Sequence, residues 1–216
     1  RSFLQADGNV KKINAHITKK VADKLGELFK NDRPSYESKW NDVGVFVKYG
    51  MLSDDKFYEK AKDFCLLKNT DNQYFTLEEY KEKVAPLQTD KDQKVVMLYT
   101  TDPGKQNTYI ESLKKRSYDV LAFDTVIDNH FVGMLEQKLE NIALKRVDSE
   151  VADKIIEKEE KIDSVLSEEQ QNAVKALFEQ TINDKNKTVL VQALPTYELP
   201  VTVTLPEFMR RMRDMN

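Results

Sequence analysis

Few side chains in this chain are suited to catalysis, and their spacing forms no catalytic or metal-binding set. The chain has two histidines, His16 and His130, and one cysteine, Cys65. Histidines this far apart show no metal-ligand spacing. Cys65 lies among apolar residues in "DFCLLK", where a buried, unreactive thiol is expected. Carboxylates are abundant, but they identify an acid–base site only through their geometry. We therefore expect no metal site and no catalytic nucleophile.

A second candidate is the turn "TDPGKQ", which begins at Thr101. It follows an apolar run of strand length and precedes a helical stretch, the position at which α/β proteins often bind nucleotides. The turn lacks both G-x-G-x-x-G and a Walker sequence, so we interpret it as a turn into a helix. The alternative is an enzyme domain with a small-molecule site at Thr101–Lys105.

The C-terminal stretch "LPEFMRRMRDMN" has residue types suited to binding other proteins. At about 100° per residue, Phe208, Met212 and Met215 fall on one stripe of a helix, with Met209 at its margin. Pro206 suits the first turn of such a helix. Unbranched methionine side chains adapt to many partner shapes, which favours an adaptable binding surface. Packing on the protein's own core is the alternative.

The composition indicates a polar protein with much helix. Of 216 residues, 33% are charged and 40% apolar, with six glycines, six prolines and a formal net charge of -3. No basic run is long enough to follow phosphates, so no nucleic-acid partner is expected. No apolar run approaches the roughly 20 residues of a membrane span, so no membrane partner is expected. A single cysteine favours a reducing, cytoplasmic location.

The elements that position these residues begin with a helical module. Apolar residues recur at intervals of three and four over residues 10–29, which predicts a long amphipathic helix. A second helix is expected to end at Gly50, and a third to cover "DDKFYEKAKDFCLL". The stretch "TLEEY" has capping-box spacing from Thr76 to Glu79 and predicts a short fourth helix.

An α/β unit follows the helical module. The runs "QKVVMLYT", "DVLAFD" and "IALKRV" have the composition of buried strands, and helical stretches lie between them. The order strand, helix, strand, helix, strand predicts a small three-layer unit with parallel strands and right-handed crossovers.

The last third of the chain is expected to form an incomplete domain. The segment "DSEVADKIIEKEEKID" is mostly charged and is interpreted as a solvated linker. A helix opening at Ser167 and two strands, "KTVLVQAL" and "PVTVTL", then precede the methionine segment. One helix and two strands bury little on both faces, so this α+β unit is expected to be incomplete.

Several separated stretches, in order, resemble one known family. They are "RSFLQADGNVKKINAHITKKVADKLGELFKNDR", "WNDVGVFVKYGMLSDDKFYEKAKDF", "YTTDPGKQNTYIESLKKRSYDVLAFDTVID" and "LPEFMRRMRDM". Together they closely resemble the ninety-kilodalton heat-shock chaperones of the bacterial HtpG type, from the middle domain to the C-terminal domain. The similarity runs the whole length of the chain, which begins at Arg1 and is expected to be a piece of a longer protein.

The resemblance implies a mixed α+β and α/β architecture divided into four segments. Residues 1–92 correspond to a catalytic-loop remnant and helical module of the middle domain, and residues 93–148 to its small α/β unit. Residues 149–164 correspond to a charged linker, and residues 165–216 to the start of the C-terminal domain.

The resemblance also implies a role in an ATP-dependent chaperone that binds partly folded client proteins. "RSFLQ" is similar to the family loop that reaches the nucleotide, so Arg1 would contact the ATP γ-phosphate and Gln5 would support the loop. This applies only to the full-length protein, with ATP and Mg²⁺ as cofactors and a homodimer as its assembly. The fragment alone is expected to be no enzyme and to bind no cofactor.

The family places client contacts on two elements of this chain. Phe208, Met209, Met212 and Met215 match its amphipathic client-binding helix. The helix matching "IDNHFVGMLEQ" faces clients as well. Some members carry a tryptophan where this chain has His130, and the neighbouring Phe131 is expected to supply the aromatic surface instead.

Overall fold

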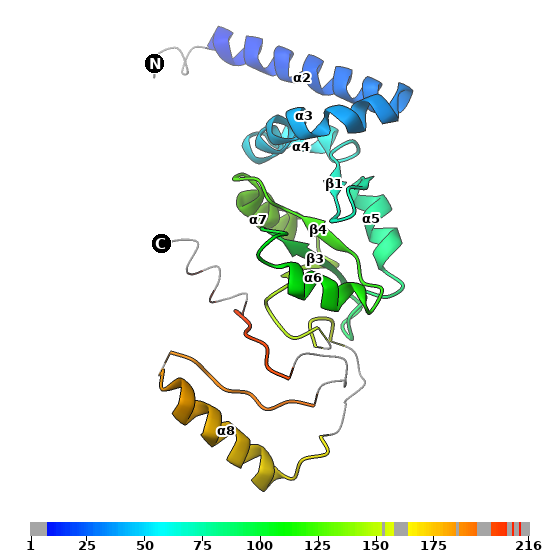
Figure 1. Cartoon of the computed structure of the whole chain (residues 1–216). Coiled ribbons are helices and arrows are strands. Elements are labelled where there is room, and N and C mark those ends of the chain that lie inside the picture. The colour runs from blue at the N-terminus through cyan, green and yellow to red at the C-terminus, as the bar shows by residue number, and fades with distance from the viewer. Residues whose placement is uncertain are drawn as a thin grey trace.

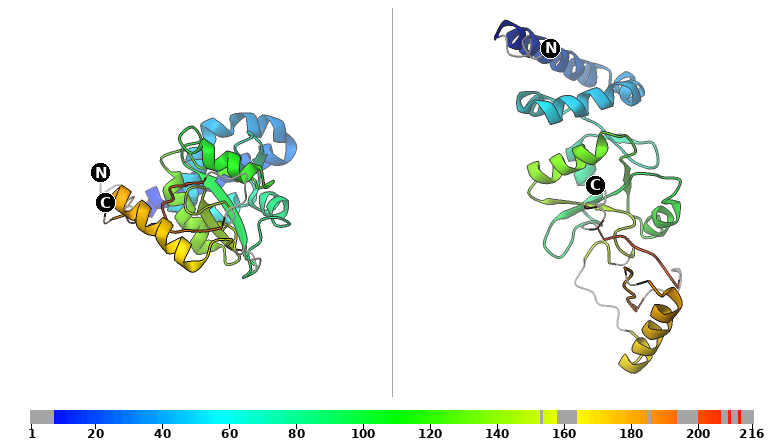
Figure 2. Two further views of the ribbon diagram at one scale, coloured as in Figure 1. Left: turned by 60° about the horizontal axis from the view of Figure 1, so that its bottom comes forward. Right: turned by 90° about the vertical axis from the view of Figure 1, so that its left-hand side faces the viewer.

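The computed structural model describes residues 8–152, 154–157, 164–184, 186–193 and 200–206, together with Met209 and Met212. Figure 1 shows a helical module at one end, an α/β unit in the middle and a C-terminal part at the other end, and the side view in Figure 2 shows the same order. The helices are α2 (Gly8–Asn31), α3 (Arg33–Ser53), α4 (Asp55–Ala61), α5 (Leu77–Val84), α6 (Asn107–Lys114), α7 (Asp128–Lys138) and α8 (Glu168–Ile182). The strands are β1 (Leu67–Lys68), β2 (Tyr74–Phe75), β3 (Val95–Thr100), β4 (Val120–Ala122) and β5 (Ile142–Arg146).

Local capping explains where the helices of the first module begin. The Asp32 carboxylate accepts the backbone amide of Ser35 at 3.1 Å and caps α3. At α5, the predicted capping box is confirmed, because the Thr76 hydroxyl and the Glu79 carboxylate each accept the other residue's backbone amide.

Gly50 has a packing role and does not end α3. The prediction that the second helix ends there is wrong, because α3 continues to Ser53. A Cβ atom at position 50 would lie only 2.7 Å from the ring of Phe57 on α4. The missing side chain therefore lets α4 pack closely against α3, and the residue remains helical.

The α/β unit has the parallel strands and the intervening helices that were predicted. Its sheet has the order β4-β3-β5, and β3 pairs in parallel with both neighbours. Side chains of β3 alternate, so that Val96 and Leu98 pack with α6 while Met97 and Tyr99 pack with α7. With a helix on each face, the unit has three layers, and all six residues of β3 are buried.

One hydrophobic core joins the helical module to the α/β unit. Tyr36 and Trp40 of α3 belong to the same buried cluster as Met97 of β3 and Phe131 of α7. The boundary predicted near residue 92 therefore divides segments that share a core.

The charged segment after β5 is packed in its first part. Ile155 and Ile156 are fully buried with α6 and the sheet, and Glu157 pairs with Lys91 and Lys145. The interpretation as a solvated linker is thus wrong for this part, because two adjacent isoleucines are sufficient to anchor it. Residues 158–163 lie outside the described residues.

The C-terminal part contains α8 and extended chain. Ser167 caps α8 in a capping box with Gln170. The helix start predicted at Ser167 is therefore confirmed. The strands predicted in "KTVLVQAL" and "PVTVTL" are not formed in residues 187–193 and 200–205. Both segments have strand-like composition, but the described residues supply no neighbouring strand to complete a ladder.

Candidate functional site

A buried ion pair fixes α7 against α3. Lys48 Nζ lies 2.5 Å from Asp128 Oδ1, and these side chains are 10% and 1% exposed. The other oxygen of Asp128 accepts the backbone amide and the hydroxyl of Thr125, at 2.9 and 2.7 Å. The Lys48 ammonium also lies 5.6 and 5.3 Å from the ring centroids of Phe123 and Phe131. The pair is therefore well satisfied, and it sets the rotation of α7.

This rotation of α7 turns Phe131 inward and His130 outward. Phe131 is 1% exposed, and its ring centroid lies 6.3 Å from that of Phe123 in the core. The expectation that Phe131 supplies an exposed aromatic surface is therefore wrong. Successive helical residues point about 100° apart, so His130 is exposed and remains a predicted contact residue.

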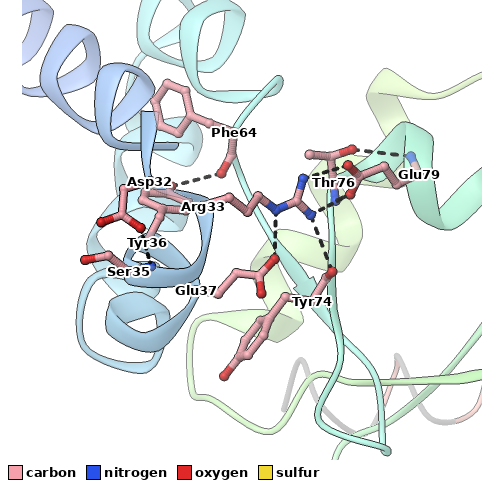
Figure 3. A network of polar contacts seen from close by, with 9 residues as sticks. All are labelled: Asp32, Arg33, Ser35, Tyr36, Glu37, Phe64, Tyr74, Thr76 and Glu79. Carbon is pink, nitrogen blue, oxygen red and sulfur yellow. Dashed lines mark hydrogen bonds and ion pairs between the residues drawn. The ribbon is translucent and has the colours of Figure 1, made fainter. Parts of the chain in front are cut away.

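Arg33 joins the start of α3 to the start of α5, as Figure 3 shows. Its guanidinium makes two hydrogen bonds to the Glu79 carboxylate, at 2.6 and 2.7 Å, and one to Glu37 at 2.7 Å. The bonds that Arg33 donates to Glu79 raise the pKa of Arg33 and lower the pKa of Glu79. Since Glu79 also completes the cap of α5, this network orients elements and leaves no carboxylate free for catalysis.

Cys65 lies in the interior of this fold. Its thiol is buried, and burial raises its pKa to about 12. The predicted burial is confirmed. A thiol that stays protonated at neutral pH is expected to be unreactive.

The turn after β3 uses its polar groups internally. The backbone amide of Thr101 donates to Gln106 Oε1 at 3.1 Å, and the backbone amide of Asp102 donates to the Thr100 hydroxyl at 3.3 Å. The backbone amide of Lys105 donates to the Asp102 carboxylate at 3.0 Å. This last bond is the main cause that lowers the pKa of Asp102, and the Lys105 ammonium lies 3.0 Å from the same carboxylate. An anionic ligand would meet a carboxylate where a phosphate site needs free amides. The geometry gives no support to the small-molecule site at Thr101–Lys105.

The C-terminal part exposes most of its apolar side chains. None of the described residues from Ser164 onward is buried. Leu177 is exposed on α8, and Val201 and Val203 are exposed in the extended chain. Met209 and Met212 are 53% and 48% exposed. Large apolar side chains that are accessible together are suited to contact with an apolar partner.

Four of the predicted site residues lie outside the described residues. They are Arg1 and Gln5 of the nucleotide loop, and Phe208 and Met215 of the methionine stripe. Their roles remain predictions, as does the single stripe of the C-terminal helix.

Sequence reasoning missed Lys48 and Arg33, although each had a signal. Lys48 lies four residues after Gly44 and three before Met51, hence on the buried side of α3. Arg33 directly follows the capping residue Asp32, so it lies at the start of α3, and there it meets α5. Neither signal identifies the distant partner.

The described part of the chain contains neither a cluster of metal ligands nor a membrane-spanning helix. In that part, no three His, Cys, Asp or Glu side chains are grouped to hold a metal ion. Nor does any described helix have the length and apolar character needed to cross a membrane.

Comparison with known proteins places these features in context. The model of the family described as Hsp90 protein matches residues 1–208. The chain is 45% identical over 218 aligned residues to a chaperone protein htpG of Bacteroides fragilis (strain YCH46) and to the HtpG of Porphyromonas gingivalis (strain W83). Each alignment covers 100% of this chain and 32% of the relative, so the chain spans about a third of their length.

Among solved structures, the fold is similar to the middle domain of a putative heat shock protein of Plasmodium falciparum. The TM-score is 0.50 at 20% identity, and the match covers 65% of this chain and 59% of that one. At this identity the likeness concerns the fold alone, and it agrees with the mixed α/β architecture described above.

Proposed function

Because this chain belongs to the Hsp90 protein family, we propose that it is part of an ATP-dependent molecular chaperone that binds partly folded client proteins and assists their folding. The relatives named chaperone protein HtpG support this proposal. The observation that carries it is the exposure of Met209 and Met212 in a C-terminal part where no described residue is buried.

The physical basis is contact between apolar surfaces. Burying a methionine-sized side chain on binding contributes about 1.5–3 kcal/mol, so a few such contacts give measurable affinity. Thioether side chains repack around different shapes, which favours breadth over selectivity. We define the methionine surface as Phe208, Met209, Met212 and Met215, and propose that it binds clients together with the exposed His130 on α7.

The remaining roles concern the whole protein and rest on the family. In it, Arg1 would contact the γ-phosphate of ATP bound with Mg²⁺, and Gln5 would support the loop. An always-charged guanidinium suits phosphate oxygens and favours the charge of a transferring phosphoryl group. We propose that the whole protein is a cytoplasmic homodimer, with no nucleic-acid or membrane partner, and that this chain alone does not hydrolyse ATP.

The proposal is tested by replacing Met209 and Met212 with serine and measuring capture of an unfolded, reduced protein. The matched control is Leu87→Ser, since Leu87 is a large apolar residue with similar exposure in the turn after α5. We expect weakened capture and almost unchanged melting for the double variant, and neither change for the control. Unweakened capture, or a stability loss of several kcal/mol typical of a core position, would contradict a binding surface.

A further inference from the structure

Residues 200–206, here called the strap, lie against the α/β unit. In Figure 1 the strap runs from the C-terminal part toward α6 and the sheet. Among the described residues, two hydrogen bonds cross this junction. The Tyr109 hydroxyl on α6 donates to the carbonyl oxygen of Val203, and the amide of Leu205 donates to the carbonyl oxygen of Asp148 at 2.9 Å. The strap is thus tied to α6 and to the turn after β5.

The exposure pattern shows that one side of the strap faces the α/β unit. Val201 and Val203 are exposed, whereas Thr202 and Thr204 are half-buried. This alternation is typical of extended chain with one side covered. The exposed valines therefore contribute little apolar burial to the attachment.

A cavity beneath the strap further limits packing at this junction. Its volume is about 500 Å³. Among the lining residues are Tyr109 and Ser112 of α6, Val147 and Val151 after β5, and Thr202 of the strap. Since an empty space supplies no partner atoms for dispersion contacts, the hydrogen bonds of Tyr109 and Leu205 are important for the attachment of the strap.

The surroundings of Tyr109 agree with a hydroxyl that stays a donor. Burial, and then the negative charge of Asp148, raise the pKa of Tyr109. The phenol therefore remains protonated over the physiological range and can donate to Val203 throughout it.

We propose that the Tyr109 hydroxyl is a latch that holds the strap against α6 and thereby positions the methionine surface relative to the α/β unit. Met209 and Met212 follow Leu205 by only four and seven residues, so the end of the strap restricts where they lie. The inference rests on the proposed function for the importance of the methionine surface, but the latch itself is a structural feature that can be measured separately.

The latch is tested with Tyr109→Phe, which removes the hydroxyl and keeps the ring. Tyr49→Phe is the matched control, because Tyr49 is an exposed tyrosine on α3. Amide hydrogen exchange of Leu205 should become about two- to twelvefold faster in Tyr109→Phe, the factor that corresponds to one typical hydrogen bond. Exchange in β3 should stay unchanged, as should all rates in the control. An unchanged rate at Leu205 overturns the latch.

The coupling to the methionine surface is tested in the same variant by capture of an unfolded, reduced protein. We expect Tyr109→Phe to change the affinity for the unfolded protein by up to about twelvefold, the same upper limit as for hydrogen exchange. Tyr49→Phe should leave this affinity unaltered. Faster exchange at Leu205 with unaltered affinity overturns the positioning role. The variant with serine at positions 209 and 212 shows separately whether the proposed function fails. If it fails, this variant captures the unfolded protein as well as the unsubstituted chain does.

Discussion

Replacing Lys48 with methionine should destabilise the fold strongly. Methionine keeps much of the stem volume and removes the charge that lies 2.5 Å from Asp128 Oδ1. Asp128 is 1% exposed, so its carboxylate would lose its cationic partner inside the core. Removing one partner of a buried pair costs about 3–5 kcal/mol. Asp128 would keep both hydrogen bonds from Thr125, which places the expected loss near the lower end, about 3 kcal/mol.

The assay is urea unfolding followed by tryptophan fluorescence. Trp40 is the single tryptophan of the chain and is buried on α3, so its emission reports on the core that the ion pair joins. Lys39→Met is the control, because Lys39 lies exposed on the same helix, and its loss should stay within about 0.5 kcal/mol. The double variant Lys48→Met with Asp128→Asn should be less destabilised than the sum of the two single changes, since no charge stays unpaired.

Two results would contradict this role of the Lys48–Asp128 pair. A loss below about 1 kcal/mol in Lys48→Met would show that the carboxylate is rehydrated and that the pair does not fix α7. Strict additivity in the double variant would show that the two groups do not interact.

Three further predictions concern Phe131, Glu79 and Cys65. Phe131→Ala should cost about 3–5 kcal/mol in urea unfolding, whereas His130→Ala should stay within about 0.5 kcal/mol; equal losses would contradict the rotation of α7. Arg33 lowers the pKa of Glu79, so the stabilisation from this carboxylate is complete above its pKa in the unfolded chain and is lost as the pH falls through its pKa in the folded chain. Between about pH 6 and about pH 3, the unsubstituted chain should therefore lose more stability than Glu79→Gln. Parallel losses of the two chains would contradict the pairing. Cys65 should react with a thiol reagent at neutral pH only after denaturant is added, and rapid reaction of the folded chain would contradict its burial.

Local signals in the sequence were sufficient for most of the α/β unit. The apolar run over β3 and the intervening helical stretches predicted a parallel sheet, and β3 does pair in parallel with both neighbours. The capping box at Thr76 could be predicted because its two residues lie three positions apart in sequence, and the start of a helix at Ser167 could be predicted from the residues that follow it. These features depend on neighbouring residues, which is why sequence alone predicts them.

Features that depend on distant partners could not be predicted in this way. Gly50 was interpreted as a helix end, but the ring of Phe57 packs at that position. The hairpin of β1 and β2 has two residues in each strand, too few for a periodicity, and its strands are fixed by pairing with each other. Tyr109 and Val203 lie 94 residues apart, and no local pattern connects them.

For the proposed binding surface, residue types could be judged from the sequence, whereas the exposure of each side chain could not. Methionine at helical spacing indicated either a core stripe or a binding surface, and exposure of Met209 and Met212 favours the surface. For Phe131, in contrast, the aromatic residue type indicated a contact residue, but α7 turns the ring into the core.

The central claim, that the methionine surface contacts clients, is tested most directly by a fluorescent probe at position 212. The single cysteine of the sequence, Cys65, is buried and is expected not to react, so Met212→Cys should be labelled alone with an environment-sensitive dye. Leu87→Cys carries the same dye as the control. On addition of an unfolded, reduced protein, we expect a blue shift and increased emission at position 212 and no change at position 87. Unchanged emission at position 212 while the unfolded protein is bound, or equal changes at both positions, would contradict the proposed binding surface.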